Sequence, residues 1–417
     1  MRILIIGSGA REHAIARALA LDPQVIDVVV APGNPGTARL QKTQNAAVDA
    51  EDPAAVSALA AQIEADLVVV GPEAPLVAGV ADAVRATGIP VFGPDAAAAQ
   101  IEGSKAFAKD VMAAAAVPTA MAHICTTTEE VEAALDAFGA PYVVKDDGLA
   151  AGKGVVVTDD RQLALAHAKE CLDHAQVVVE EFLDGPEVSL FCLSDGTTVV
   201  PLAPAQDFKR LRDGDDGPNT GGMGAYSPLT WAPDGLTDQV VDRVALPAVR
   251  ELAHRGTPFV GLLYCGLALT SRGLRVVEFN ARFGDPETQV VLARLESSLA
   301  SALLAAATGR LDEMPPLRWS DGAAVTVVVA SHGYPELVRT GDPITGIEAA
   351  ESLPGVHVLH AGTSTADDGA LLTSGGRVLS VVGTGVDVAA ARATAYAGVA
   401  EIGIPGSQHR TDIALDR

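Results

Sequence analysis

Two polar residues near position 280 have the types and spacing of a metal site. Glu278 and Asn280 stand two positions apart in an otherwise apolar run that begins at Val276. In a β-strand both side chains would project from the same face. A carboxylate and an amide oxygen suit a hard cation such as Mg²⁺ that bridges nucleotide phosphates. Arg282 continues this face if the strand persists, and could stabilise charge on a transferring phosphoryl group. The alternative is an edge strand with a solvated polar face.

A glycine-rich segment carries two of the seven lysines in the chain. Lys145 ends the strand-like run that starts at Tyr142, and three glycines precede the next apolar run, 155–158. No helix follows, and the glycine spacing differs from a Walker A loop. The pattern predicts a hairpin whose backbone amides fold over a triphosphate, with Lys145 and Lys153 neutralising phosphate oxygens. The alternative is an ordinary glycine hairpin with exposed lysines.

Two further segments could contact a nucleotide or another anion. The run 177–180 ends in acids and could present backbone to an adenine, with Glu187 meeting ribose hydroxyls; an ordinary strand with a polar end fits equally well. The loop 7–12 follows a strand-like run and opens a helix, which makes an anion site. Glu12 stands at the third glycine position of a dinucleotide fingerprint, so phosphate binding aided by Arg11 and His13 is favoured over NAD. A tight strand–helix turn remains the alternative.

The elements that would position these residues begin with an open parallel sheet. Apolar runs at 3–6, 28–30, 67–70 and 91–92 alternate with alanine-rich helical stretches, a pattern typical of a parallel sheet covered on both faces. Ligands of such sheets bind at the loops after the strands, here 7–13, 32–37 and 71–75. A helix is expected from Ser104 until Pro118 stops it, then a smaller α/β unit, further strands and a terminal α/β portion. The loop 212–219 contains too many turn formers for regular structure.

Bulk composition narrows the function classes. The chain has 417 residues and a net charge of −24, a balance that disfavours nucleic acid and anionic membranes as partners. The four cysteines are far apart and form no CxxC pair, so neither a disulfide framework nor a zinc site is expected. The apolar run at the N-terminus is too short for a signal peptide or a membrane span. We expect a cytoplasmic protein.

Taken in order, these segments resemble the ATP-grasp superfamily, in which two α/β lobes hold ATP between them. More narrowly, the chain resembles the phosphoribosylamine–glycine ligase family over essentially all of its length. The resemblance rests on Gly-x-Gly-x-Arg-Glu-His-Ala at 7–14, Ala-Pro-Gly-Asn-x-Gly-Thr at 31–37, Gly-Pro-Glu-Ala-Pro-Leu-Val at 71–77, Gly-Ser-Lys at 103–105, Asp-Gly-Leu-Ala-Ala-Gly-Lys-Gly-Val at 147–155, Gly-Pro-Asn-Thr-Gly-Gly-Met-Gly-Ala-Tyr-Ser-Pro at 217–228, Glu-Phe-Asn-Ala-Arg-Phe-Gly-Asp-Pro-Glu-Thr-Gln at 278–289 and Gly-Gly-Arg-Val-Leu at 375–379.

The resemblance implies an α/β fold (α+β over the whole chain) in three domains. Residues 1–102 would form an open parallel α/β domain that binds substrate. Residues 103–322 would form a two-lobed ATP-grasp domain with its smaller lid lobe at 119–187, and residues 323–417 a small C-terminal domain. The implied reaction joins glycine to 5-phosphoribosylamine with ATP, through glycyl phosphate, giving glycinamide ribonucleotide, ADP and phosphate in purine synthesis. The implied partners are these small molecules alone, with a monomeric enzyme.

The resemblance also implies roles at matching positions. The implied metal ligands, for Mg²⁺ or Mn²⁺, are Glu278 and Asn280. The implied catalytic residues are Lys145, Asp207, Arg282 and Asp285. The implied ATP-binding residues are Lys105, Lys145, Gly152, Lys153, Gly154, Glu180, Glu181, Phe182, Leu183 and Glu187. The implied substrate-binding residues are Gly9, Arg11, Glu12, Gly33, Asn34, Gly36, Thr37, Pro72, Glu73 and Lys209.

Three departures from the family pattern and three alternatives remain. Asp146 stands where alanine is usual, Phe208 where histidine is common, and the connection at 170–177 is shorter than usual.

A carboxylase-type ATP-grasp ligase using bicarbonate or formate would differ in its substrate. A nucleotide-binding regulator would lack turnover, and an NAD-dependent oxidoreductase would bind nicotinamide.

Overall fold

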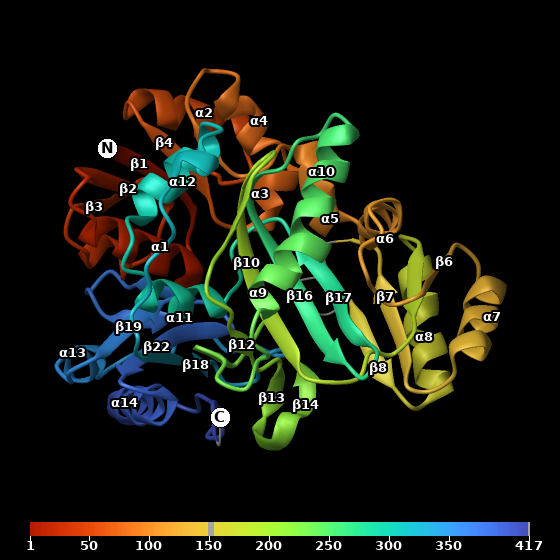
Figure 1. Ribbon diagram of the computed structural model, residues 1–417. Helices are drawn as coiled ribbons and strands as arrows, with labels where there is room; N and C mark the ends of the chain where they lie inside the picture. The colour runs from red at the N-terminus through yellow and green to blue at the C-terminus, as the bar shows by residue number, and fades with distance from the viewer. Residues whose placement is uncertain (149–153, 416–417) are drawn as a thin grey trace.

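The N-terminal part of the chain folds around a five-stranded parallel sheet. The computed structural model describes residues 1–148 and 154–415, and Figure 1 shows this sheet in red at the N-terminal end. The strands lie in the order β3-β2-β1-β4-β5, and every neighbouring pair is parallel. Their bounds are β1 Arg2–Gly7, β2 Asp27–Pro32, β3 Thr43–Asn45, β4 Leu67–Val70 and β5 Val91–Phe92.

Both faces of this sheet are buried, as the continuous apolar runs predict. In β1, Leu4 and Ile6 belong to one hydrophobic cluster, while Ile3 and Ile5 belong to another. All four predicted strands are confirmed, and only β3 is additional, a short polar strand at the sheet edge. The helices of this part are α1 Ala10–Leu21, α2 Pro53–Gln62, α3 Glu73–Val77 and α4 Val80–Arg85.

The small lobe is an antiparallel sheet with two helices and a core of its own. It follows α5 (Ala96–Gly103) and α6 (Lys105–Ala114), which Pro118 separates from it. Its strand order is β6-β9-β7-β8, and it stands apart at the right of Figure 1. Its elements are β6 Ala122–Cys125, α7 Thr128–Phe138, β7 Tyr142–Asp146, β8 Val155–Thr158, α8 Arg161–Leu172 and β9 Val177–Glu180. The predicted hairpin is confirmed, because β7 pairs with β8 antiparallel.

The large lobe is built on a second antiparallel sheet, with the order β11-β10-β16-β17. The π-helical turn at Val241–Ala245, which joins helices α9 and α10, packs on this sheet, and so does helix α12. Its elements are β10 Glu187–Asp195, β11 Val199–Pro201, α9 Leu236–Val240, α10 Leu246–His254, β16 Val260–Thr270, β17 Gly273–Asn280, α11 Glu287–Arg294 and α12 Leu299–Ala307.

The C-terminal sheet draws strands from two distant parts of the chain. Its order is β12-β15-β18-β22-β19, so two strands from the middle of the chain complete a sheet made mostly by the last hundred residues. Its elements are β12 Gln206–Asp207, β15 Gly224–Ser227, β18 Ala323–Ala330, α13 Ile347–Glu351, β19 Val356–His360, β22 Arg377–Gly385 and α14 Val388–Glu401, with a separate hairpin of β20 Thr363–Thr365 and β21 Leu371–Thr373. The predicted fold class, with its parallel N-terminal sheet and further α/β parts, is confirmed.

One local prediction is wrong. The segment 212–219 is not irregular: β13 (Arg210–Arg212) pairs antiparallel with β14 (Asp216–Asn219). The reason lies far away in sequence, where the buried Arg410 guanidinium bonds to Asp215 Oδ1 at 2.7 Å and to the carbonyl of Arg210 at 3.2 Å. A tertiary contact therefore overrides the turn-forming composition of the segment.

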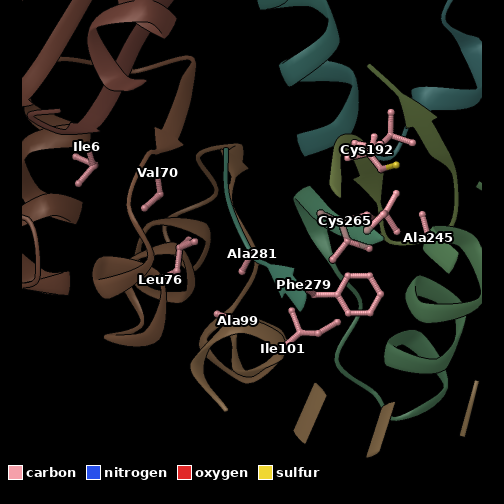
Figure 2. Close-up of a cluster of buried hydrophobic side chains, with 14 of the residues drawn as sticks. Ile6, Val70, Leu76, Ala99, Ile101, Cys192, Ala245, Cys265, Phe279 and Ala281 are labelled. Atoms are coloured by element: carbon pink, nitrogen blue, oxygen red, sulfur yellow. The ribbon is translucent and has the colours of Figure 1, made fainter. Parts of the chain in front are cut away.

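A continuous hydrophobic core joins the N-terminal sheet to the large lobe. Figure 2 shows Ile6 and Val70 on one side and Cys265 and Phe279 on the other, with Ala99 of α5 and Ala281 between them. The small lobe has a separate cluster that includes Val131, Leu135 and Val179. Hydrophobic packing therefore joins the N-terminal part and the large lobe into one body. The small lobe has its own core and is attached mainly through its chain connections and polar contacts.

Within the part of the chain that the structure describes, no helix combines the length and apolar character needed to span a bilayer.

A pair of buried histidines joins α1 to the end of β19. The His360 backbone N–H donates to His13 Nδ1 at 2.8 Å, and the two rings lie 5.7 Å apart. Asn34 Nδ2 donates to the His360 carbonyl at 2.9 Å, which adds the loop after β2 to the same contact. Burial, with help from the nearby charges of His360 and Arg17, lowers the pKa of His13 to about 3. The contact therefore requires neutral imidazole.

This contact predicts a loss of stability in mild acid. The folded-state pKa of His13 lies below its ordinary value of 6.5, so its contribution is present above pH 6.5 and is lost as the pH falls toward 3. We expect His13→Gln to remove up to about 1.4 kcal/mol per pH unit from the slope of unfolding free energy against pH. Urea unfolding at pH 7, 6, 5 and 4 measures both slopes. Equal slopes in the two proteins would contradict the assignment.

Candidate active site

A cavity of about 740 Å³ lies where the small lobe faces the large-lobe sheet, and it receives residues from every part of the chain. Its wall is rich in charged side chains, which distinguishes it from the apolar clusters around it. The predicted site residues that line it are Arg11, Glu73, Lys105, Lys145, Gly154, Glu180, Glu181, Phe182, Leu183, Glu187, Asp207, Lys209, Glu278, Asn280, Arg282 and Asp285.

The pair Glu278 and Asn280 ends strand β17 on the cavity side. Both residues line the cavity, and Phe279 between them, although it also borders the cavity, is a buried member of the hydrophobic cluster of Figure 2. Burial would raise the pKa of Glu278, but Lys209, Lys145, Lys105 and Arg282 together lower it, so the carboxylate is ionised. No three His, Cys, Asp or Glu side chains of the described residues gather as a metal cage. A carboxylate and an amide fit Mg²⁺ that takes its other ligands from phosphates and water.

Arg282 reaches the cavity although the strand does not persist to it, since β17 ends at Asn280. Its guanidinium pairs with Glu102 at 2.7 Å and with Glu73 at 3.1 Å; burial alone would lower its pKa, but these two acids outweigh burial and leave the pKa raised. Burial and the Glu73 charge raise the pKa of Glu102 to about 7 even though Arg282 opposes the shift. Glu73 is the first residue of α3 in the N-terminal part and Glu102 lies in α5, so Arg282 ties these two helices to the end of β17.

The phosphate-binding candidates Lys105 and Lys145 are held at the base of the small lobe. Lys145 Nζ lies 2.9 Å from Glu180 Oε2 and 3.1 Å from the Val277 carbonyl. Glu180 Oε1 takes a second ammonium, Lys109, at 3.0 Å, so one buried carboxylate bridges two lysines. Lys105 Nζ contacts the Gly148 carbonyl at 2.9 Å, and burial lowers its pKa. The predicted residues Gly152 and Lys153 lie outside the described residues.

The residues that follow β9, 181–183, also line the cavity. Glu181 holds the start of β6 through Met121 N–H and pairs with Arg272 at 2.8 Å, while Phe182 is 45% exposed. Glu187, expected at a ribose, pairs with Lys209 at 2.6 Å. Both ends of that ion pair face the cavity, so a bound nucleotide would meet a preformed charge pair.

Carboxylates crowd the cavity floor between β12 and α11. Burial, followed by the charges of Glu287, Glu187 and Glu278, raises the pKa of Asp207 to about 8, with Lys209 opposing. Asp285 is balanced differently: burial would raise its pKa, but Arg377 and Arg11 lower it. Arg377 Nη2 lies 3.4 Å from Asp285 Oδ2 and brings the C-terminal sheet to this wall.

The N-terminal loops are arranged differently from a simple anion site. Glu12 is 1% exposed, and its own carboxylate accepts the Gly9 N–H at 2.6 Å and pairs with Arg11 at 2.5 Å. A Cβ at Gly7 or Gly71 would collide with this side chain, so the glycines leave room for it. Only Arg11 of this loop lines the cavity, with Nη1 donating to the Phe283 carbonyl at 3.0 Å.

The loop after β2 uses its polar groups internally. Asn34 Oδ1 accepts the N–H groups of Gly36 and Thr37 at 2.8 and 3.0 Å, and its amide donates to the carbonyls of Ser8 and His360. The structure does not bring to the cavity wall the predicted substrate-binding residues Gly9, Glu12, Gly33, Asn34, Gly36, Thr37 and Pro72. These residues shape the edge of the N-terminal sheet behind Arg11 and Glu73.

The departures from the family pattern have local partners. Asp146 Oδ2 lies 3.2 Å from His174 Nε2, which places the added carboxylate beside the short connection after α8. Phe208 is 8% exposed and packs its ring under the Arg410 guanidinium, 5.0 Å from its centroid. Neither residue replaces one of the lysines or the Glu278–Asn280 pair.

Sequence reasoning missed several charged or polar residues of this wall: Glu102, Lys109, Tyr264, Glu287 and Arg377. Two of them lay inside motifs already singled out, Glu287 in 278–289 and Arg377 in 375–379. Lys109 could have been found as one of seven lysines in an arginine-rich chain. No local signal marks Glu102, because its role depends on the distant Arg282.

Two lobes that enclose lysines, opposite a strand ending in a carboxylate and an amide, define an ATP-grasp ligase. Three family models match the chain in order: the phosphoribosylglycinamide synthetase N domain at residues 1–102, its ATP-grasp (A) domain at 103–288 and its C domain at 324–416. The chain belongs to the phosphoribosylglycinamide synthetase family and is a carbon–nitrogen ligase.

Individual relatives agree with this assignment along the whole chain. A phosphoribosylamine–glycine ligase of Streptomyces coelicolor is 66% identical over 416 residues, covering 99% of each chain. One from Leifsonia xyli is 60% identical over 415 residues, again covering 99% of each. The crystal structure of phosphoribosylamine–glycine ligase from Thermotoga maritima has 33% identity and a TM-score of 0.85, covering 99% of this chain and all of that one.

The bridge between Lys109, Glu180 and Lys145 predicts a specific stability pattern. Glu180→Gln leaves two buried ammonium groups without their counter-charge, so we expect the unfolding free energy to fall by about 3–5 kcal/mol. The double variant Lys109→Met/Glu180→Gln removes one of those ammoniums and should recover part of the loss. Urea unfolding without nucleotide measures both. A double variant no more stable than the single one would show that Glu180 does not act as the counter-charge.

Proposed function

We propose that this chain joins glycine to 5-phosphoribosylamine with ATP, giving glycinamide ribonucleotide, ADP and phosphate. The observation that carries the proposal is the ordered match of three domains of one synthetase family, together with a cavity that gathers buried lysines around Glu278 and Asn280. The reaction is the step of purine synthesis performed by the family.

The chemistry proceeds in two transfers. A glycine carboxylate oxygen attacks the γ-phosphorus of ATP, the bond to ADP breaks, and glycyl phosphate forms. The amine of phosphoribosylamine then attacks the carbonyl carbon, a proton leaves the nitrogen, and phosphate departs with the former carboxylate oxygen. The protein supplies positioning and charge stabilisation, since no side chain forms a covalent bond.

We assign the nucleotide to the interface of the two lobes. Lys105 and Lys145 neutralise its phosphates, Glu187 contacts the ribose and the backbone at 181–183 contacts the adenine. Gly154 and Glu180, which were also predicted to bind ATP, line the same cavity. Glu278 and Asn280 hold Mg²⁺ or Mn²⁺, which when bound screens the phosphate charge. Arg282 and Lys145 stabilise the transferring phosphoryl group, and Asp207, Lys209 and Asp285 surround glycine.

Phosphoribosylamine is assigned to the N-terminal side of the cavity. Arg11 and Glu73 are the predicted residues of that side which line the wall. The loops 7–13, 33–37 and 71–75 shape this side, with Gly9, Glu12, Asn34 and Thr37 holding it together. We further propose a monomeric, cytoplasmic enzyme divided at 1–102, 103–322 and 323–417.

An omission assay tests the reaction. ADP release is measured with Mg²⁺, ATP, glycine and freshly generated phosphoribosylamine, leaving out each in turn. We expect product formation to need all four components. We expect Glu278→Ala to lower kcat/KM by more than about a hundredfold, because mutating even a residue that only hydrogen-bonds to a metal ligand lowers metal affinity or activity about 10–100-fold. The exposed Glu296→Ala is the matched control and should keep wild-type activity. ADP release with bicarbonate or formate in place of glycine would instead identify a carboxylase-type ligase.

Isotope labelling tests the intermediate separately. Glycine labelled with ¹⁸O in its carboxylate should transfer one labelled oxygen to the released phosphate, because that oxygen attacks the γ-phosphorus. Mass spectrometry of the phosphate measures the transfer. Unlabelled phosphate together with product formation would rule out glycyl phosphate while leaving the overall reaction intact.

A further inference from the structure

The buried carboxylate of Glu287 has one oxygen that the protein leaves unused. Glu287 is the first residue of α11 and is only 3% exposed. Its Oε1 accepts hydrogen bonds from Ser189 Oγ and from the Tyr264 hydroxyl, both at 2.9 Å. Among the described residues no donor bonds to Oε2, and this atom is not one of the fully enclosed unpaired polar atoms. Because Glu287 lines the cavity, Oε2 faces it.

The two hydroxyls that hold Glu287 stand in the same sheet rows as the proposed metal ligands. Tyr264 pairs directly with Asn280 across β16 and β17. Ser189 pairs with Gly266, which in turn pairs with Glu278. Residues in one row of an antiparallel sheet share a face and are close neighbours. The free oxygen of Glu287 is therefore held beside the end of the cavity at which phosphoryl transfer is proposed.

The surroundings of Glu287 favour a cation. The carboxylates of Glu287, Glu187 and Glu278 all act on Asp207 here, while Lys209 is the ammonium paired among them. Glu287 also interacts electrostatically with Arg282 and Arg377, because its charge helps to raise the pKa of each guanidinium. No third acid completes a metal cage with Glu287 in the described parts of the chain. An ammonium group needs fewer ligands and fits a single free carboxylate oxygen.

We propose that Glu287 Oε2 receives the α-ammonium group of glycine, with Ser189 and Tyr264 as the residues that position it. The inference rests on the proposed function and names one of its binding contacts. The ammonium and carboxylate of glycine are joined through one carbon, so the group that binds the ammonium must lie next to the phosphoryl-transfer site. Glu287 meets this requirement. Gly284 is needed beside it, since a Cβ there would lie 2.7 Å from Oε2.

Glu287→Gln tests the contact, because an amide oxygen can still accept from Ser189 and Tyr264 while the charge is removed. We expect the KM for glycine to rise about tenfold to a hundredfold, as for loss of a hydrogen bond to a charged group. The KM for ATP should change less than about threefold by the same reasoning. Glycolate, which carries a hydroxyl in place of the ammonium, serves as the probe. The ratio of its inhibition constant to the glycine KM should fall about tenfold in the variant.

Two further proteins make the result decisive. Tyr264→Phe keeps the Glu287 charge but removes one positioning hydroxyl, so it should raise the glycine KM less and leave the glycolate ratio closer to wild type; it also serves if Glu287→Gln fails to fold. The exposed Glu296→Gln should match wild type in every measurement. If Glu287→Gln folds, an unchanged glycine KM together with an unchanged glycolate ratio would overturn the Glu287 inference but not the proposed function. If only Tyr264→Phe folds, an unchanged glycine KM in that variant would have the same meaning. A wild-type protein that does not use glycine would overturn the proposed function together with the Glu287 inference.

Discussion

The two-residue period of strand β17 ties the hydrophobic core to the chemistry. Phe279 must enter the core cluster, and this obliges Glu278 and Asn280 to face the cavity together. The neighbouring strand β16 pairs with β17 so that Tyr264 lies opposite Asn280 and Gly266 lies opposite Glu278. Core packing thus fixes the directions of the polar side chains, and a shift of one residue would exchange the buried and the cavity-facing sets.

Charge compensation is the second organising principle of this strongly acidic chain. Three of its cavity cations are matched with carboxylates before any ligand arrives: Lys145 with Glu180, Lys209 with Glu187 and Arg282 with Glu73 and Glu102. Buried charges require such partners, because desolvation would otherwise make them very costly. The partners come from both lobes and from helices α3 and α5, so the same ion pairs that prepare the cavity also hold its walls together.

The sequence predicted most of the elements because their signals are local. Continuous apolar runs marked four of five strands of the first sheet, and the spacing of Glu278 and Asn280 marked their shared face. What the sequence did not show depended on contacts between distant residues. The hairpin at 210–219 needs Arg410, and the position of the Glu12 side chain depends on room beside the distant Gly71. Glu102 and Glu287 acquire their places only when α5 and α11 meet β17 and its neighbours.

The mixed origin of the C-terminal sheet bears on how the protein is made. A ribosome synthesises β15 long before β18, its partner in the sheet, so the edge of β15 stays unpaired until the last quarter of the chain emerges. An unpaired strand edge is a template for wrong pairing with other chains. Asp207, at the end of β12 in the same sheet, reaches its final surroundings only then. The nascent chain can therefore complete this wall of the cavity only after β18 and β22, which begins with Arg377, have been synthesised.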